Sequence, residues 1–461
     1  MKTYIALAGN MTFQRKPSGA SLVKTVRDDG KWKSKYRKAV NMDGARLLEL
    51  CDGQLTTEEL LEKHNRLYPD NILVREAAAA FFDSAEKEAM IIRGPEKIKS
   101  DARVAGSFEH YYPNHMTFEL TDQCNYRCAH CYRESSPDLH KRLDTAKVKE
   151  YISALHENGG SVIELTGGEP MLHKDFFELV DYACERMNLV AILTNGYYLQ
   201  EEAIARLLKH KKTLIFNISL DSHRKDCHDR LRGKEGAFDK TINAMRLLGE
   251  NGFRYRVAMS VMGENNFDIE ETIGLARKYK ATTFGYNHIL DFGRGEGLSS
   301  GAPKATPEAA KKRYEYETRI RETHKDFLNM LTAEQLKSVK STNCGIIHRT
   351  VTVGPDGEVR PCAMFGGDVI EVGNIMKQSF KELFKSGIGN VFAAMPAPKA
   401  EICGDCKYLP YCGNCILRGI KKGSKTPGCK WLEKTGVMKY VKEAPQAKVC
   451  GNIQEPTQSL G

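Results

Sequence analysis

The chain has 461 residues, about three domains at roughly 150 residues each. With 41% hydrophobic and 28% charged residues its composition is that of a globular protein and excludes wholesale disorder. The net charge of +10 fits an acidic partner but does not by itself indicate nucleic acid. The unusual number is 14 cysteines, which need a use as disulfides, metal ligands or redox clusters.

The first residues do not predict export. The apolar run over 4–8 is shorter than the roughly 7 to 15 residues of a signal-peptide core. The longest apolar window, 214–220, has the length of a strand and is far below a membrane span of about 18 residues or more. We therefore expect a cytoplasmic protein without a membrane partner, in which reducing conditions disfavour structural disulfides.

Residues 1–97 have the pattern of a winged-helix-like domain. Short strand-like runs come first, and helical patterns follow after Asn41, after Thr56 and over 74–89. Thr56 and Glu59 have the spacing of a capping box, in which a hydroxyl and a carboxylate satisfy free amides of the first turn. A polar connector is expected over 97–106.

The pattern then changes to alternating strands and helices. Strand-length apolar runs alternate with amphipathic helical windows, which is typical of repeated βαβ units and a parallel sheet. The runs are 116–120, 161–165, 189–193, 214–220, 255–261 and 283–289.

The last third of the chain divides into three stretches. Residues 304–341 are helical and charged and predict bridging helices. Over 342–441 cysteine and glycine dominate and periodicity is lost, which is typical of a segment held by metal rather than by a hydrophobic core. Residues 442–461 are expected to be a tail.

A first cysteine cluster directly follows the first strand of this sheet. Cys124, Cys128 and Cys131 lie on one tight loop and can bind one metal centre. A structural zinc site needs four protein ligands, whereas three leave a coordination position for another molecule. The alternative is a structural zinc site in which His130 is the fourth ligand beside the three cysteines.

This cysteine pattern, followed by the aromatic Tyr132, resembles the radical S-adenosylmethionine (SAM) enzymes. In that family three thiolates hold a 4Fe-4S cluster whose fourth iron is chelated by SAM, and reductive cleavage yields a 5'-deoxyadenosyl radical. The resemblance implies an α/β fold, a partial (β/α)6 TIM-like barrel over 108–303. It also implies catalytic roles for the three cysteines and an external reductant such as flavodoxin or ferredoxin.

Further motifs follow the later strands in the order that the family has. Residues 167–170, Gly-Gly-Glu-Pro, resemble the motif that binds the cofactor amino group: glycines allow close backbone approach, and a glutamate accepts hydrogen bonds from an ammonium. Ser219 and Arg232 are the implied contacts to the cofactor carboxylate. The whole implied set is Tyr132, Gly167, Gly168, Glu169, Pro170, Thr194, Asn195, Ser219, Asp221 and Arg232.

Seven cysteines lie in the C-terminal segment. A zinc ribbon would use Cys403, Cys406, Cys412 and Cys415, and would leave three unused. The segment also resembles the SPASM extension of radical SAM enzymes, which carries one or two auxiliary iron-sulfur clusters, here two of 4Fe-4S type. The sets implied are Cys403, Cys406, Cys412 and Cys429 for one cluster, and Cys344, Cys362 and Cys415 for the other.

One spacing departs from the family pattern. Cys412 and Cys415 are separated by two residues where the family usually has three, which leaves exchange of a ligand between the sets open. The fourth ligand of the second set is Cys450, a non-cysteine group or the substrate. The remaining cysteines, Cys51, Cys184 and Cys227, are expected to be small packing residues or bystanders.

The N-terminal domain has two interpretations. A basic strip can meet DNA phosphates or be a solvated hairpin; its members are Arg15, Lys16, Lys24, Arg27, Lys31, Lys33, Lys35, Arg37 and Lys38. Residues 41–53 and 56–60 instead resemble the PqqD-like recognition element of ribosomal-peptide maturases. That element docks a leader peptide as an added strand, and basic side chains would favour an acidic leader.

Together the resemblances imply a maturase that abstracts hydrogen from a precursor peptide and forms a thioether or carbon-carbon crosslink. We prefer the thioether of the sactipeptide and ranthipeptide type, because an incompletely ligated cluster can bind a cysteine. Asp291 and Arg294 are candidates for the substrate chamber, and no general base is named. The alternatives are a sulfatase-type formylglycine maturase, another SPASM oxidoreductase, and a metal-sensing winged-helix regulator. A nucleic-acid partner is not expected.

Overall fold

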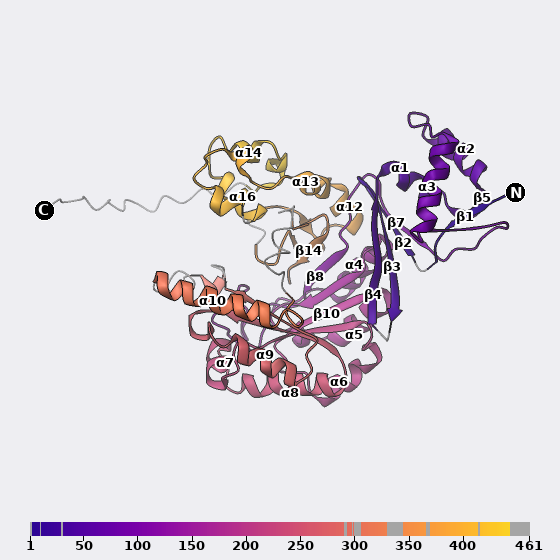
Figure 1. Cartoon of the computed structure of the whole chain (residues 1–461). Helices are drawn as coiled ribbons and strands as arrows, with labels where there is room; N and C mark the ends of the chain where they lie inside the picture. Colours follow the sequence, from indigo (N-terminus) through magenta and orange to yellow (C-terminus); the bar gives the residue numbers. More distant parts are fainter. Residues whose placement is uncertain are drawn as a thin grey trace.

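The structure is a computed structural model that describes residues 2–9, 11–28, 31–289, 293–296, 298, 306–329, 344–365, 369–413 and 415–442. An N-terminal unit, a central sheet with helices and a C-terminal region follow one another along the chain and lie at different ends of the molecule (Figure 1). Within these residues no helix has the length and apolar character to cross a membrane.

The N-terminal unit begins with a small antiparallel sheet covered by three helices. The sheet has the order β5 (Asp52–Thr56), β1 (Tyr4–Leu7), β6 (Ile91–Gly94). The helices are α1 (Met42–Glu49), α2 (Thr57–Leu67) and α3 (Arg75–Lys87).

The sequence predicts these helices because their apolar faces repeat with helical spacing, and they bury Leu48, Leu60 and Phe82 in one core. The predicted capping box is confirmed: the Thr56 side chain accepts from the Glu59 amide, and the Glu59 carboxylate accepts from the Thr56 amide at 2.9 Å. The cap fixes where α2 begins.

A second sheet joins this unit to the rest of the chain. Its order is β4 (Lys31–Val40), β3 (Gly19–Asp28), β2 (Met11–Lys16), β7 (Arg103–Gly106). The expectation of a polar connector over 97–106 is therefore wrong at β7, because pairing with β2 creates a strand that the local pattern does not show. Gln14 Nε2 donates to the Asn158 carbonyl at 3.3 Å and docks the sheet on the central domain.

Six parallel strands form the central sheet, and the predicted alternation of strands and helices is confirmed. The order β13-β12-β11-β10-β9-β8 places consecutive strands side by side, as in a barrel of βα units. The strands are β8 (His115–Glu119), β9 (Val162–Thr166), β10 (Leu189–Thr194), β11 (Leu214–Ser219), β12 (Arg254–Val261) and β13 (Thr283–His288).

Helices pack on the outer face of the sheet (Figure 1). They are α4 (Thr145–Glu157), α5 (Phe176–Arg186), α6 (Glu201–Leu207), α7 (Lys225–Arg232), α8 (Ala237–Glu250) and α9 (Ile269–Lys278). Beyond β13, α10 (Pro307–Thr323) agrees with the first predicted bridging helix; residues 330–343 lie outside the described residues.

The C-terminal region continues the same sheet. β14 (Thr350–Val353) pairs in parallel with β8, and β15 (Glu358–Arg360) and β16 (Gly373–Asn374) follow antiparallel. Phe392 and Trp431 are buried in the same hydrophobic cluster as the barrel. The expectation that metal replaces a hydrophobic core here is therefore wrong: the buried apolar residues come from helices of only four to eight residues, which are too short to give an extended periodic pattern.

The later cysteines lie in or next to the last four of the short helices of this region. The short helices are α12 (Phe380–Lys385), α13 (Ile388–Ala394), α14 (Ala400–Cys403), α15 (Leu409–Cys412), α16 (Ile416–Gly423) and α17 (Lys430–Glu433). A buried ion pair between Glu119 of β8 and Arg360 of β15 ties the region to the barrel, and Arg133 lies 3.1 Å from the same carboxylate.

Candidate active site

The first cysteine loop is held by its backbone at the carboxyl end of β8. The Cys124 amide donates to the Ser136 carbonyl at 3.0 Å, and the Ala129 amide donates to the Leu231 carbonyl at 2.9 Å. Cys124, Cys128 and Cys131 all line one cavity of about 230 Å³. The carboxyl ends of parallel strands are where such folds bind ligands, so the loop lies where the fold predicts a site.

Gly167 and Gly168 bring the loop after β9 under the cysteine loop. Gly167 has a φ of +138°, and a Cβ there would lie 2.3 Å from the Thr121 carbonyl oxygen; a Cβ on Gly168 would lie 2.2 Å from that of Gln123. The Gly168 amide donates to the Thr121 carbonyl at 2.7 Å. The glycines thus allow two loop backbones to touch, in addition to lining the cavity.

Glu169 lies beside this cavity but does not line it. Its buried carboxylate accepts from the Thr194 hydroxyl at 2.8 Å and from the Asn195 amide at 3.0 Å. Burial raises its pKa to about 7, although these hydrogen bonds act in the other direction. Glu169 and the buried Pro170 are absent from the cavity wall, whereas Thr194 and Asn195 line it, so the carboxylate fixes the loop after β10.

Arg232 and Asp221 form a buried ion pair beside the cysteines. Arg232 Nε lies 2.8 Å from Asp221 Oδ2, and its Nη2 donates to Oδ1 at 2.9 Å. Its Nη1 lies 3.9 Å from Cys128 Sγ, and the side chain lines the cavity. Burial by itself would raise the pKa of Asp221, but the Arg232 charge outweighs this effect and holds that pKa below its usual range. One positive charge is therefore fixed at the cavity wall.

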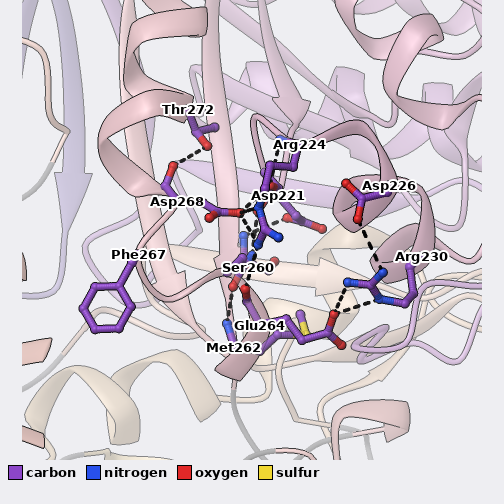
Figure 2. Close-up of polar contacts among 12 residues, drawn as sticks. Asp221, Arg224, Asp226, Arg230, Ser260, Met262, Glu264, Phe267, Asp268 and Thr272 are labelled. Carbon is purple, nitrogen blue, oxygen red and sulfur yellow. Dashed lines mark hydrogen bonds and ion pairs between the residues drawn. The ribbon is translucent and has the colours of Figure 1, made fainter. Parts of the chain in front are cut away.

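The end of β12 and the loop after it hold Asp221 in turn (Figure 2). The Ser260 amide donates to Asp221 Oδ1 at 2.9 Å, and buried Asn265 donates to the Asp221 carbonyl at 2.6 Å. Figure 2 shows Arg224 with Asp268 and Arg230 with Glu264 around this point, pairs that join α7 to the same loop. Asp221, absent from the cavity wall, is thus a positioning residue.

Several cavity residues escape sequence reasoning. Asn217 lies two residues before Ser219 on β11, so period-two alternation places both on the face that lines the cavity and could have found it. On β12, Ala258 and Ser260 are likewise two residues apart and both line the cavity. Ser135 and Tyr126 also line the cavity and carry no motif signal.

His130 and Arg294 both line the cavity. His130 Nε2 lies 3.6 Å from Asp221 Oδ2, and burial lowers its pKa to about 4. Arg294 Nε donates to the Cys128 carbonyl at 2.9 Å and its Nη2 to the Ser135 carbonyl at 2.9 Å, so it clamps the cysteine loop from the cavity wall. Asp291 lies outside the described residues.

The C-terminal cysteines are brought together in two groups. One small cavity is lined by Cys403, Cys406, Cys412 and Cys429, with Tyr408 and Trp431 among its walls. Burial raises the pKa of Cys362, and neighbouring Cys344 and Cys415 raise it further. The set for a zinc ribbon is not assembled, because Cys429 rather than Cys415 shares the cavity. Cys450 lies outside the described residues.

These thiols suit clusters better than single ions. Among the described residues no three His, Cys, Asp or Glu side chains lie close enough to hold one metal ion. Each group nevertheless offers only sulfur ligands, the donors that iron-sulfur clusters use, and a four-iron cluster is a larger body than one ion. Cys51 and Cys227 are buried and Cys184 is half-buried, away from these groups.

Comparison with known proteins gives the family. The model of the radical SAM superfamily matches residues 118–276, and that of the SPASM iron-sulfur cluster-binding domain matches residues 344–407. The antilisterial bacteriocin subtilosin biosynthesis protein AlbA of Bacillus subtilis (strain 168) is 34% identical over 396 residues, 84% of this chain and 87% of AlbA. The sporulation killing factor maturation protein SkfB of the same strain is 28% identical over 283 residues, 61% of this chain and 67% of SkfB.

A solved structure shows the same fold. Streptococcus suis SuiB bound to precursor peptide SuiA matches with a TM-score of 0.63 and 13% identity, over 93% of this chain and 98% of that one. Parallel strands with a cysteine loop at their carboxyl ends define an iron-sulfur enzyme of the SAM-dependent class. The chain belongs to the radical SAM superfamily and carries a SPASM domain. It uses SAM, a 4Fe-4S cluster and auxiliary iron-sulfur clusters.

Proposed function

We propose that this enzyme matures a ribosomally synthesised precursor peptide by forming an intramolecular crosslink. The observation that carries the proposal is the 34% identity to a bacteriocin biosynthesis protein over 84% of the chain. The relation to a sporulation killing factor maturation protein supports the same class of substrate. When bound, the cluster and SAM together supply a 5'-deoxyadenosyl radical that abstracts hydrogen from carbon.

The chain's own residues bind and orient this cofactor. Cys124, Cys128 and Cys131 hold the cluster, and the Gly167-Gly168 backbone borders the cavity beside them. Thr194, Asn195 and Ser219 offer hydrogen-bonding groups along the wall. Arg232 presents the charge that suits the cofactor carboxylate, and the half-buried Tyr132 adds an aromatic wall. Glu169 and Asp221 act through the residues that they hold.

The preferred product is a thioether. Cys344, Cys362 and Cys415 are three sulfur ligands, and a cubane cluster has four irons, so one iron is left for a group such as a substrate thiolate. A carbon-carbon crosslink is the alternative, in which this cluster only takes up an electron. Cysteine residues in the precursor would favour the first outcome.

The N-terminal unit is proposed as a PqqD-like element that binds the leader. At the β5 edge the Ile98 amide donates to the Gly53 carbonyl at 3.0 Å, so residues outside the sheet cover this edge. At the opposite edge, β6, Ile92 is 42% exposed. An exposed edge strand is a template for an added strand, so β6 is the proposed docking edge.

One anaerobic reaction tests the function. The reconstituted enzyme is incubated with SAM, reductant and the peptide encoded beside its gene, and the product is analysed by mass spectrometry. A thioether or carbon-carbon crosslink removes two hydrogens from the peptide, and fragmentation locates the bridge. Oxidation of a single Cys or Ser without a bridge would instead indicate a formylglycine-type maturase.

Metal content is a second, independent test. Two or three cubane clusters predict roughly eight to twelve irons per chain. Zinc with little iron would exclude the proposed chemistry and favour a metal-sensing regulator. Deletion of residues 1–97 should abolish binding of the peptide and leave the iron content of the remaining chain unchanged.

A further inference from the structure

Positive charge is concentrated at the end of the C-terminal region. Residues 415–442 contain eight Lys and Arg and one acidic residue, Glu433, which gives a net charge of +7, whereas the whole chain has +10. The basic residues are Arg418, Lys421, Lys422, Lys425, Lys430, Lys434, Lys439 and Lys442. We call these eight side chains the lysine surface.

Most of this charge is not neutralised within the described chain. Lys442 lies 3.4 Å from Glu358, but no ion pair involves Lys425, Lys430 or Lys434, and all three are exposed. An excess of like charges within one short stretch of chain produces repulsion that destabilises the compact state. An acidic partner would remove that repulsion.

The lysine surface borders the four-cysteine cavity. Lys422 lines this cavity together with Cys429, and Cys406 of the same set is exposed. Lys425, Cys429, Glu433 and Met438 are among the residues that line a neighbouring groove of about 390 Å³, and Met438 is 50% exposed. A cluster held by these cysteines would therefore lie just under a basic surface with an apolar contact in it.

The active-site cavity does not share this surface. None of the residues that line it comes from 399–442. In Figure 1, α14 and α16 lie at the end of the molecule remote from the N-terminal unit, where the leader is proposed to bind. A peptide that reaches from the proposed docking edge, β6, to the active site therefore does not have to contact the lysine surface.

We propose that the lysine surface is the docking site of a small acidic one-electron carrier protein. The inference rests on the proposed assignment of the four cysteines to an auxiliary cluster. Complementary charge steers two proteins into an encounter, and interfaces between electron-transfer proteins are small and short-lived. In the docked complex one electron passes from the reduced carrier to the cluster, so the carrier is oxidised by one electron and the cluster is reduced by one.

The test compares two triple variants of the holoenzyme. K425E/K434E/K439E reverses charge on the lysine surface. K377E/K381E/K385E makes the same charge change on exposed lysines at and before α12, in the same region but outside the lysine surface. Reduced flavodoxin is the probe, and its affinity and its rate of oxidation by the enzyme are measured against ionic strength.

We expect the first triple to weaken affinity and slow electron transfer about tenfold at low salt, and to flatten the salt dependence. The control triple should stay within about twofold of the parent. Equal effects of both triples, or none, would overturn the proposal. If charge reversal lowers the iron content, the K425Q/K434Q/K439Q triple removes charge without new repulsion and gives the same comparison.

Other occupants give other results. Loss of affinity for the precursor peptide in the first triple, with flavodoxin oxidation unchanged, would assign the lysine surface to the peptide and overturn the inference. With dithionite as reductant the first triple should still crosslink the peptide at the parent rate. Failure of the parent itself to crosslink under dithionite counts against the proposed function, whereas the flavodoxin comparison needs no peptide.

Discussion

The two cysteine regions of this molecule are built in different ways. In the barrel, hydrogen bonds and a buried ion pair fix the loop that carries Cys124, Cys128 and Cys131. In the C-terminal region the cysteines lie at the ends of short helices such as α14 and α15, and Cys344 and Cys406 are exposed. The difference suggests that the protein preforms the first site, whereas metal must complete the second.

The largest expected effect separates the chemical roles of the two regions. Replacing Cys124, Cys128 and Cys131 by Ala should abolish 5'-deoxyadenosine formation, because no cluster remains to cleave SAM. Replacing Cys403 by Ala should abolish crosslinking but retain 5'-deoxyadenosine, measured by chromatography. Retained SAM cleavage in the first variant would show that the wrong triad was chosen.

Removal of iron should sharpen the structural contrast. A site that metal completes loses order without it, because binding free energy is then folding free energy. Chelation should raise hydrogen-deuterium exchange over 400–412, where α14 and α15 bury no residue, by a large factor and change β8 to β11 little. If amide protection from exchange changes equally in both regions after chelation, the contrast between a preformed barrel site and a second site completed by metal would be contradicted.

Asp221→Asn tests the preformed network in the barrel. It leaves Arg232 as an unpaired buried charge, which should destabilise the protein by about 3 kcal/mol or more in denaturant unfolding. The control is Glu250→Gln, which removes the exposed pair with Arg246 and should cost at most about 1 kcal/mol. Similar losses of unfolding free energy in both variants would show that the buried Asp221–Arg232 pair stabilises the protein no more than an exposed pair does.

Glu169 gives the smallest expected effect, in the pH dependence of stability. Its pKa in the folded protein, about 7, is above the ordinary value of 4.5. Its contribution to stability is therefore full below pH 4.5 and is lost as pH rises through 7. Glu169→Gln should flatten the change in unfolding free energy between pH 5 and 7.5, and an unchanged slope would exclude this role.

The sequence predicts most of the barrel and the order of its motifs. The strands at 116–120 and 214–220 are visible because an apolar residue recurs at every second position. The Thr56 cap is visible because its partners are three residues apart. The strand β7 and the pairing of β14 with β8 cannot be read from the sequence, because the strands that they pair with are distant in the chain.

By itself the sequence determined which side chains are candidates for the chemistry, since cysteine spacing and Gly-Gly-Glu-Pro are local patterns. Tertiary structure decided how these residues are used. It turned Glu169 to Thr194 and Asn195, paired Arg232 with Asp221, and grouped Cys429 with Cys403 and Cys406. The physical reason is that burial of a charged or sulfur group depends on neighbours from other strands and helices, which no local pattern encodes.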